Sequence, residues 1–259
     1  MLTERFAALR AASRCALVCY VTAGHPDRAR SLALLRGLAD AGADVLEVGV
    51  PFSDPVADGP VIQGSSQRAL ELGMTLDGAL DLVAEAKLDI PVVLFSYLNP
   101  VIAAGPGVLD RAKKAGVHGI LITDLPVGED PAREAWFGAG PLDFIRLVAP
   151  TTPRHRMARI AAHGRGFVYV ISRLGVTGVQ EALSSSLPAT IARLRDVCAL
   201  PICVGFGIST AEQARTVGAL ADGIVVGSAI VQAADRSVDE AIALARTFRT
   251  ALDAGIRRA

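Results

Sequence analysis

Eight short apolar runs recur along the chain, and segments with helical periodicity separate them. Valine, isoleucine and leucine dominate these runs, which lack the polar alternation of a half-exposed strand, so they predict strands buried on both faces of a parallel sheet. The helical segments include "RARSLALLRGLADAG", "LDGALDLVAEAK" and "GVLDRAKKAG". The predicted strands cover 16–22, 45–49, 92–96, 119–123, 144–148, 167–171, 202–206 and 223–227.

This alternation predicts the α/β class and, within it, a single (β/α)8 TIM barrel. The 259 residues suit that fold, and no linker or change of composition marks a second domain, so we expect one domain over 1–259. A doubly wound open sheet is the alternative, but no GxGxxG follows the first predicted strand. Barrel active sites lie at the carboxyl ends of the strands, so the candidate residues are sought there.

Composition excludes several classes of protein. The 26 basic residues balance the 26 acidic ones, which argues against nucleic acid as the main partner. The most basic stretch, "RHRMARIAAHGR", is predicted to be a solvated helix face. Neither a membrane-length apolar run nor a secretory signal is recognisable, so we expect a cytoplasmic protein.

Cysteine and histidine spacing gives no sign of a metal site. The four cysteines form no CxxC pair, and we expect buried free thiols. The four histidines are scattered without ligand spacing. A metal held by this chain is therefore not expected.

The stretch "EVGVPFSDPVADGP" contains the two strongest candidates for catalytic carboxylates, Glu47 and Asp58. Glu47 interrupts an apolar strand, where an unpaired carboxylate costs free energy unless it has a function. Burial would raise its pKa toward neutrality, which suits a group that gives and takes a proton. Asp58 lies on the following loop, either as a turn former or as a second catalytic carboxylate at the same barrel mouth.

Glycine-rich turns follow the last two predicted strands. "GFGIST" and "VVGSAIV" would let backbone N–H groups approach a phosphate, with Ser228 as an additional donor. Ordinary turns that need glycine are the alternative.

"ISRLGVTG" follows the sixth strand and has the composition of a mobile lid.

Aromatic side chains gather near the predicted strand ends, although aromatic residues make up only 5% of the chain. They favour a flat apolar substrate, with simple core packing as the alternative. The residues alone therefore predict an enzyme that uses carboxylate acid/base chemistry on a phosphorylated metabolite with an apolar part, without a metal or a bound organic cofactor. The aromatic residues concerned are Tyr20, Phe95, Tyr97, Tyr169 and Phe206.

At these residues the chain resembles the α subunit of tryptophan synthase. The likeness covers essentially the full length. It is carried, in the family's order, by "YVTAGHP", "LEVGVPFSDPVADGPVIQ", "TDLPVGE", "APTTP", "FVYVISRLGVTG", "GFGIS" and "VVGSAIV". The resemblance implies cleavage of indole-3-glycerol phosphate to indole and glyceraldehyde 3-phosphate by a retro-aldol reaction.

The resemblance also assigns roles to residues of this chain. It implies that Glu47 moves protons between the glycerol hydroxyl and the ring, and that Asp58 stabilises positive charge at the indole nitrogen. It makes Arg173 and Thr177 lid residues, with Thr177 meeting the aspartate on closure. The implied phosphate site comprises Gly178, Gly207, Gly227 and Ser228. The implied indole pocket comprises Tyr20, Ile62, Phe95, Tyr97, Leu121, Leu147, Tyr169 and Phe206.

A partner follows from the same resemblance. The loop "PFSDPVADG" would pack against a tryptophan synthase β subunit in an α2β2 heterotetramer, with Asp54 and Asn99 at or near the interface. Pyridoxal phosphate would belong to that partner, and no cofactor is expected in this chain. Asp124 matches a family position at the mouth without a chemical step. His25 and Arg146 depart from the family pattern, and the sequence offers no account of Arg146.

Three other functions stay open at this point. A stand-alone indole-3-glycerol phosphate lyase would share the same site and work without a β partner. A non-catalytic regulatory subunit that binds a phosphate ligand would have no need of Glu47 and Asp58. Another phosphate-binding barrel, such as an isomerase or a Schiff-base aldolase, is the third; the aldolase would need a lysine at a strand end, and the predicted strands contain none.

Overall fold

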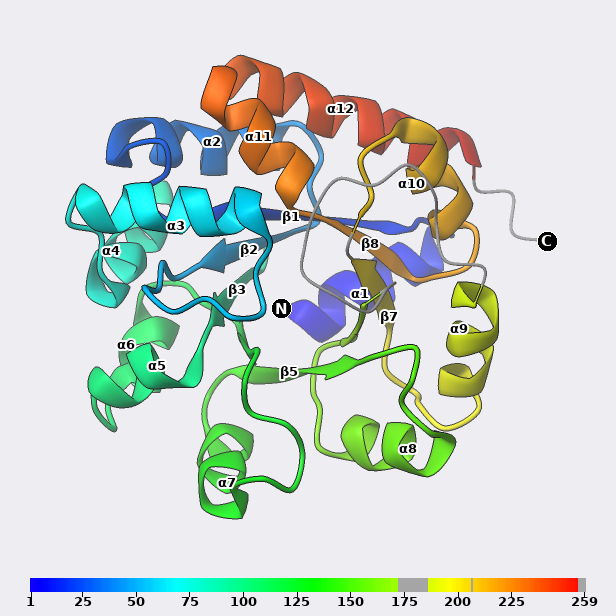
Figure 1. Cartoon of the computed structure of the whole chain (residues 1–259). Helices are drawn as coiled ribbons and strands as arrows, with labels where there is room; N and C mark the ends of the chain where they lie inside the picture. Colours follow the sequence, from blue (N-terminus) through cyan, green and yellow to red (C-terminus); the bar gives the residue numbers. More distant parts are fainter. Residues whose placement is uncertain (172–185, 206, 256–259) are drawn as a thin grey trace.

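A computed structural model describes residues 1–171, 186–205 and 207–255, and its eight parallel strands close into a barrel with helices around it (Figure 1). The predicted (β/α)8 barrel is confirmed. The first three strands have the predicted bounds, and β4, β5, β6 and β8 each differ from the predicted range by one residue at one end. The seventh agrees over 202–205, and residue 206 lies outside the described residues. The strands are β1 Ala16–Thr22, β2 Val45–Gly49, β3 Val92–Ser96, β4 Gly119–Ile122, β5 Asp143–Val148, β6 Val168–Ile171, β7 Ile202–Gly205 and β8 Gly223–Val226.

Several helices begin where a side chain satisfies the free backbone N–H groups of the first turn. Asp27 and Thr75 cap α2 and α4, and Thr210 forms a capping box with Gln213 at α10. The helices are α1 Leu2–Ala11, α2 Arg28–Asp40, α3 Pro60–Glu71, α4 Leu76–Ala86, α5 Leu98–Ala103, α6 Val108–Lys114, α7 Pro131–Ala139, α8 Arg154–Ala162, α9 Leu187–Arg195, α10 Ala211–Gly218, α11 Ser228–Arg236 and α12 Val238–Gly255.

Alternate strand residues divide between two apolar cores. Val18, Val45 and Val93 belong to a cluster inside the barrel, whereas their neighbours along each strand pack outward against the helices. Helix α1 closes the amino-terminal end of the barrel from inside, where Phe6 packs on Phe167 with ring centroids 5.5 Å apart. The inward positions nearest the carboxyl ends of the strands are therefore those available to a site.

The closed end of the barrel is also held by a buried ion-pair cluster. Asp44, which is 1% exposed, lies 2.6 Å from the guanidinium of Arg5 and 3.0 Å from that of Arg249. Its carboxylate also accepts the N–H of Leu17 at 2.9 Å. These contacts join α1, β1 and α12, and they satisfy a charge that would be costly to bury alone.

The sequence predicted neither a membrane helix nor a metal site, and the structure can be examined for both in residues 1–171, 186–205 and 207–255. No helix there is long and apolar enough to span a membrane. In the same residues, no group of histidine, cysteine, aspartate and glutamate side chains is arranged to hold a metal ion. The four cysteines are free thiols, and three of them are buried.

Candidate active site

Glu47 points into the barrel near the carboxyl end of β2. It pairs in register with Tyr20 of β1 and Val93 of β3, and it shares its face of the strand with Val45 of the inner core. The side chain is 1% exposed. Neither carboxylate oxygen has a hydrogen-bond partner among residues 1–171, 186–205 and 207–255.

This isolation changes the chemistry of the carboxyl group. Burial raises the pKa of Glu47 from its ordinary value of 4.5 to about 8, because no neighbouring charge or donor offsets the lost hydration. Glu47 is therefore mostly protonated at neutral pH and is able to donate a proton.

Asp58 is held on the loop between β2 and α3. Its N–H donates to the carbonyl of Pro55 at 3.0 Å, and its carbonyl accepts the side-chain amide of Gln63 at 2.8 Å. Burial raises the pKa of Asp58 to about 6, and a hydrogen bond with Tyr97 acts in the opposite direction. At neutral pH this carboxylate is mainly ionised, in contrast to Glu47.

Two tyrosines connect the carboxylates. Burial and the charges of both Glu47 and Asp58 raise the pKa values of Tyr20 and Tyr169. Both carboxylates therefore act on the same two side chains, so the four groups lie near one another at the carboxyl ends of the strands.

Each tyrosine occupies the space above a glycine of the next strand. A Cβ added to Gly49 would lie 2.1 Å from the Tyr20 hydroxyl, and one added to Gly205 would lie 2.0 Å from the Tyr169 hydroxyl. The sequence analysis missed this role for Gly49 and Gly205. The signal was available, since glycine inside a strand often marks a close approach by another group.

The predicted apolar pocket residues fall into two adjoining clusters. Tyr20, Ile62 and Val231 form one, and Phe95 packs against it, edge-on to Tyr20 at 5.3 Å between ring centroids. Phe95 also packs against the inner barrel core, which contains Leu121 and Tyr169 and has Leu147 at its edge. The sequence analysis did not include Val231. It lies one helical turn after Gly227, and that spacing could have placed it at the mouth.

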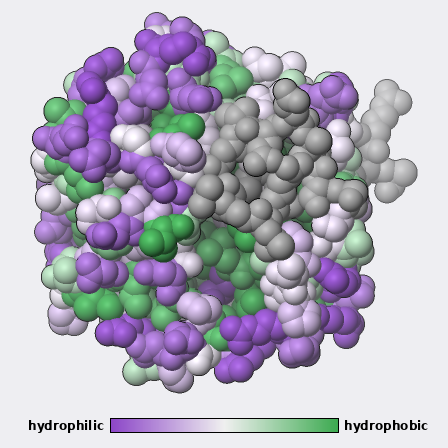
Figure 2. Space-filling model, in the orientation of Figure 1, coloured by the Kyte–Doolittle hydropathy of each residue, from purple (hydrophilic) through white to green (hydrophobic). Residues whose placement is uncertain are grey.

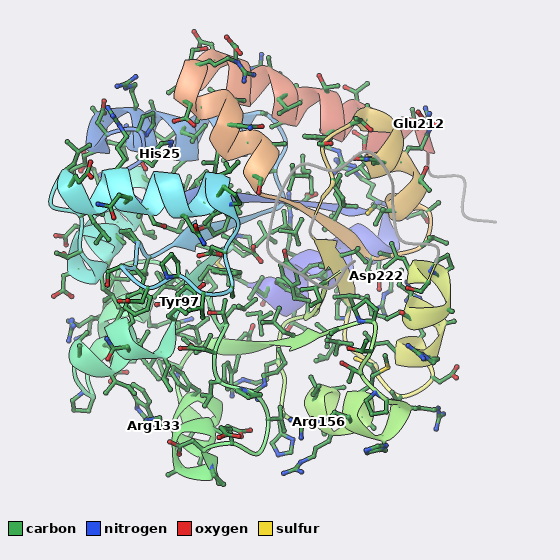
Figure 3. All side chains as sticks on the ribbon, in the orientation of Figure 1. His25, Tyr97, Arg133, Arg156, Glu212 and Asp222 are labelled. Carbon is green, nitrogen blue, oxygen red and sulfur yellow. The ribbon has the colours of Figure 1, made fainter. Side chains whose placement is uncertain are left out.

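Tyr97 links the end of β3 to the Asp58 loop. It lies directly after β3, and its ring packs on Phe52 with centroids 5.1 Å apart (Figure 3). Its hydroxyl accepts the N–H of Ala57 at 2.9 Å and is hydrogen-bonded to Asp58. Tyr97 therefore supports the Asp58 loop.

Part of the predicted phosphate site lies at the turns after β7 and β8. Gly207 has a φ of +83°, a conformation that favours glycine. Gly227 caps α11, and Ser228 is the first residue of that helix, whose free N–H groups suit an anion. A Cβ on Gly227 would lie 3.5 Å from that of Tyr20, so this turn borders the same pocket. Four predicted residues, Arg173, Thr177, Gly178 and Phe206, lie outside the described residues.

The remaining candidates, Asp54, Asn99 and Asp124, occupy exposed positions after β2, β3 and β4. Asp54 and Asn99 are exposed, and Val56, between Asp54 and Asp58 in the sequence, is 79% exposed. Asp124 accepts the N–H of Leu98 at 2.7 Å and so fixes the start of α5, a structural role.

His25 is a buried side chain on the loop after β1. Its Nε2 lies 2.9 Å from the carboxylate of Asp235, which fastens the loop after β1 to α11 (Figure 3). The departure at His25 thus concerns a contact of the loop after β1.

Comparison with known proteins now adds to this geometry. The model of the family described as tryptophan synthase alpha chain matches residues 6–255. The chain belongs to this family. Two relatives named tryptophan synthase alpha chain are those of Desulfatibacillum aliphaticivorans, 46% identical over 237 residues (90% of this chain and 89% of that protein), and of Caulobacter vibrioides, 48% identical over 233 residues (88% and 84%).

Solved structures of tryptophan synthase share the same barrel. One from Mycobacterium tuberculosis superposes with a TM-score of 0.90 at 34% identity and covers 97% of both chains. The alpha subunit from Legionella pneumophila gives a TM-score of 0.88 at 34% identity and covers 98% of both chains. The predicted family resemblance is therefore confirmed. The tryptophan synthase alpha chains are lyases of tryptophan biosynthesis that cleave indole-3-glycerol phosphate.

Proposed function

We propose that this chain cleaves indole-3-glycerol phosphate to indole and glyceraldehyde 3-phosphate, with Glu47 as the proton carrier and Asp58 as a fixed negative charge. The observation that carries the assignment is the contrast between two buried carboxylates that face the same tyrosines. One has a pKa of about 8 and the other a pKa of about 6. At neutral pH the pocket thus offers a proton donor and an anion together.

The first proton transfer prepares the bond for cleavage. Glu47 donates its proton to C3 of the indole ring, and positive charge develops on the ring nitrogen. Asp58 stabilises this charge through the ring N–H. Tyr97 keeps the Asp58 carboxylate in place for this contact.

The second transfer returns the proton to Glu47. The Glu47 carboxylate removes the proton of the hydroxyl on the glycerol carbon next to the ring. As that carbon becomes an aldehyde, its bond to C3 breaks, and the bonding electrons neutralise the ring nitrogen. Indole leaves as a neutral molecule, and Glu47 is protonated again.

Substrate binding would use the rest of the mouth. Tyr20, Phe95 and Ile62 supply a flat apolar surface for the indole. The phosphate would bind to the N–H groups at the start of α11 and after β7, with the Ser228 hydroxyl as a further donor. The predicted contributions of Gly178, Phe206, Arg173 and Thr177 belong to this proposal as well.

The proposal includes a tryptophan synthase β subunit as partner, in an α2β2 assembly. The Mycobacterium tuberculosis structure that resembles this chain is of tryptophan synthase. Asp54 and Asn99 would lie at the interface, and the exposed apolar side chain of Val56 suits a surface that becomes covered. Pyridoxal phosphate would be bound by the partner.

Indole release from indole-3-glycerol phosphate tests this function. The purified chain is assayed with and without an added β subunit, and the expected result is slow release that rises when the partner is present. Fast release that the partner does not change would favour a stand-alone lyase. Absence of release in both cases would contradict the proposed reaction and leave a binding subunit as the better account.

A further inference from the structure

Arg146 is a buried cation on the outer face of β5. Its neighbours Ile145 and Leu147 face the inner core, so Arg146 points away from the barrel interior, toward α7 and α8. The side chain is 3% exposed. Its guanidinium carbon lies 4.3 Å from the ring centre of Phe144, and its Nη2 lies 3.4 Å from Oε2 of Glu134. These contacts explain how a buried arginine is accommodated on β5, which the sequence alone did not explain.

The ion pair leaves part of the guanidinium unsatisfied. Nη1 of Arg146 is buried and has no hydrogen-bond partner within the described residues. The other oxygen of Glu134 is already engaged, because Oε1 accepts the N–H of Gly128. A buried donor without an acceptor is costly and uncommon in folded proteins. This nitrogen is therefore available to donate a hydrogen bond to a bound ligand.

A small cavity adjoins this guanidinium. It has a volume of about 100 Å³ and lies between the loop after β4 and helix α8. Arg146 and Arg156 line it together with the Thr123 side chain. Most of the remaining wall is aliphatic and includes Ile122, Leu125, Val127 and Ile160.

The figures show the part of the molecule around β5 and α8. In Figure 2 a hollow lined mainly by hydrophobic residues opens beside β5, and a small hydrophilic patch lies at its floor. Figure 3 shows Arg156 on the side of α8 that faces α7. The basic stretch around α8 is therefore only partly the solvated face predicted from sequence, since Arg154 is exposed but Arg156 is half-buried.

The charges around the cavity do not balance. Burial lowers the pKa of Arg146, the charge of Glu134 acts against this, and the charge of Arg156 adds to the lowering. Arg159 is exposed, but its guanidinium lies close to Gly128 and adds positive charge nearby. Within the described residues, Glu134 is the only carboxylate that forms an ion pair with either arginine lining the cavity, so one of the two positive charges has no paired carboxylate there.

We propose that this cavity binds a short-chain aliphatic monocarboxylate. Its carboxylate would accept hydrogen bonds from Arg146 and Arg156, and its hydrocarbon tail would pack on Ile122, Leu125 and Ile160. A phosphate is a poorer match, because the aliphatic wall would leave several of its oxygens without donors. Leu147, which faces the inner core, also lines this cavity, so the cavity adjoins the barrel interior at the end of β5. The inference does not rest on the proposed lyase reaction.

Butyrate is the probe, and butyramide is its uncharged analogue of the same shape. Saturation-transfer NMR and calorimetric titration of the whole chain should show saturable binding of butyrate and none of butyramide. Arg156→Gln should weaken butyrate binding roughly tenfold or more, since a charge-assisted contact is lost. Arg154→Gln is the matched control on the same helix. Arg154 is exposed and lies 4.0 Å from Asp196, so its loss should leave binding unchanged.

A second variant tests Arg146 without leaving a buried charge alone. Glu134→Gln combined with Arg146→Met removes both members of the ion pair, and circular dichroism confirms that the chain is folded. This variant should lose butyrate binding. The inference is wrong if the wild-type chain shows no saturable binding, if butyramide binds equally well, or if Arg156→Gln has no effect. Tighter binding of inorganic phosphate at the same arginines would also overturn the proposed ligand class.

Discussion

The Tyr97 hydroxyl is hydrogen-bonded to the carboxylate of Asp58 and also accepts the N–H of Ala57 at 2.9 Å. Tyr97 follows β3, whereas Asp58 lies on the loop after β2, so this contact ties the loop to the neighbouring strand end. The donated hydrogen bond favours the ionised carboxylate and opposes the effect of burial. The contact thus sets both the position and the charge of Asp58.

Tyr97→Phe should move the acid limb of the pH–activity profile to higher pH. Without the hydroxyl, burial alone acts on Asp58 and its pKa rises above about 6. We expect kcat/KM to be roughly fivefold lower at pH 6 and nearly unchanged at pH 8. The substrate phosphate titrates in the same range, so the readout is the difference between the two proteins. A limb at the same pH in both would show that Tyr97 does not control Asp58.

The wild-type profile itself should be bell-shaped. Activity requires ionised Asp58 and protonated Glu47, so kcat/KM should fall below about pH 6 and again above about pH 8. Glu47→Asp should retain the acid limb, because that limb belongs to Asp58. Initial rates of indole release across this range give the profile, and constant activity up to pH 10 would contradict the role of protonated Glu47.

Gly49→Ala should destabilise the barrel and lower activity. Its Cβ would lie 2.1 Å from the Tyr20 hydroxyl, which must move out of the pocket. Overpacking of this kind costs about 1–3 kcal/mol in the free energy of unfolding, measured by urea titration. Gly64→Ala is the control in helix α3, where nothing lies within 4 Å, and it should stabilise the chain by about 0.5–1 kcal/mol. Equal effects at both positions would remove the steric explanation.

Glu47 should also make the stability of the chain depend on pH. In the unfolded chain this carboxyl loses its proton near its ordinary pKa of 4.5, whereas in the folded chain it keeps the proton up to about 8. The folded state binds more protons in this window, so wild-type stability falls as pH rises through it. Glu47→Gln lacks this term and should gain about 3–4 kcal/mol relative to wild type between pH 5 and pH 8. Parallel stability curves would show that Glu47 is not buried as a neutral acid.

Most of the fold was predictable because it depends on local patterns. Continuous apolar runs identify buried parallel strands, and the bounds of β1, β2 and β3 follow directly from them. The interruption of one such run by Glu47 also predicted a buried carboxylate with a raised pKa. Both inferences need only the preference of a residue type for a particular environment.

The contacts between distant segments were not predictable from one sequence. Tyr97 looks like any aromatic residue after a strand, and nothing local shows that its hydroxyl reaches Asp58. Arg146 looked anomalous until Glu134, twelve residues earlier on α7, was found beside it. Such contacts depend on how neighbouring strands and helices align, and the sequence pattern does not contain that alignment.

The central claim is that Glu47 carries the proton in cleavage, and a single-turnover assay of Glu47→Gln tests it most directly. Indole formation from bound indole-3-glycerol phosphate is followed for wild type and variant, each saturated with β subunit, and ligand affinity is measured separately. We expect the variant to form indole at least roughly a hundredfold more slowly while its affinity for a phosphate ligand stays largely intact. Indole formation at a rate close to that of wild type would remove Glu47 from the reaction.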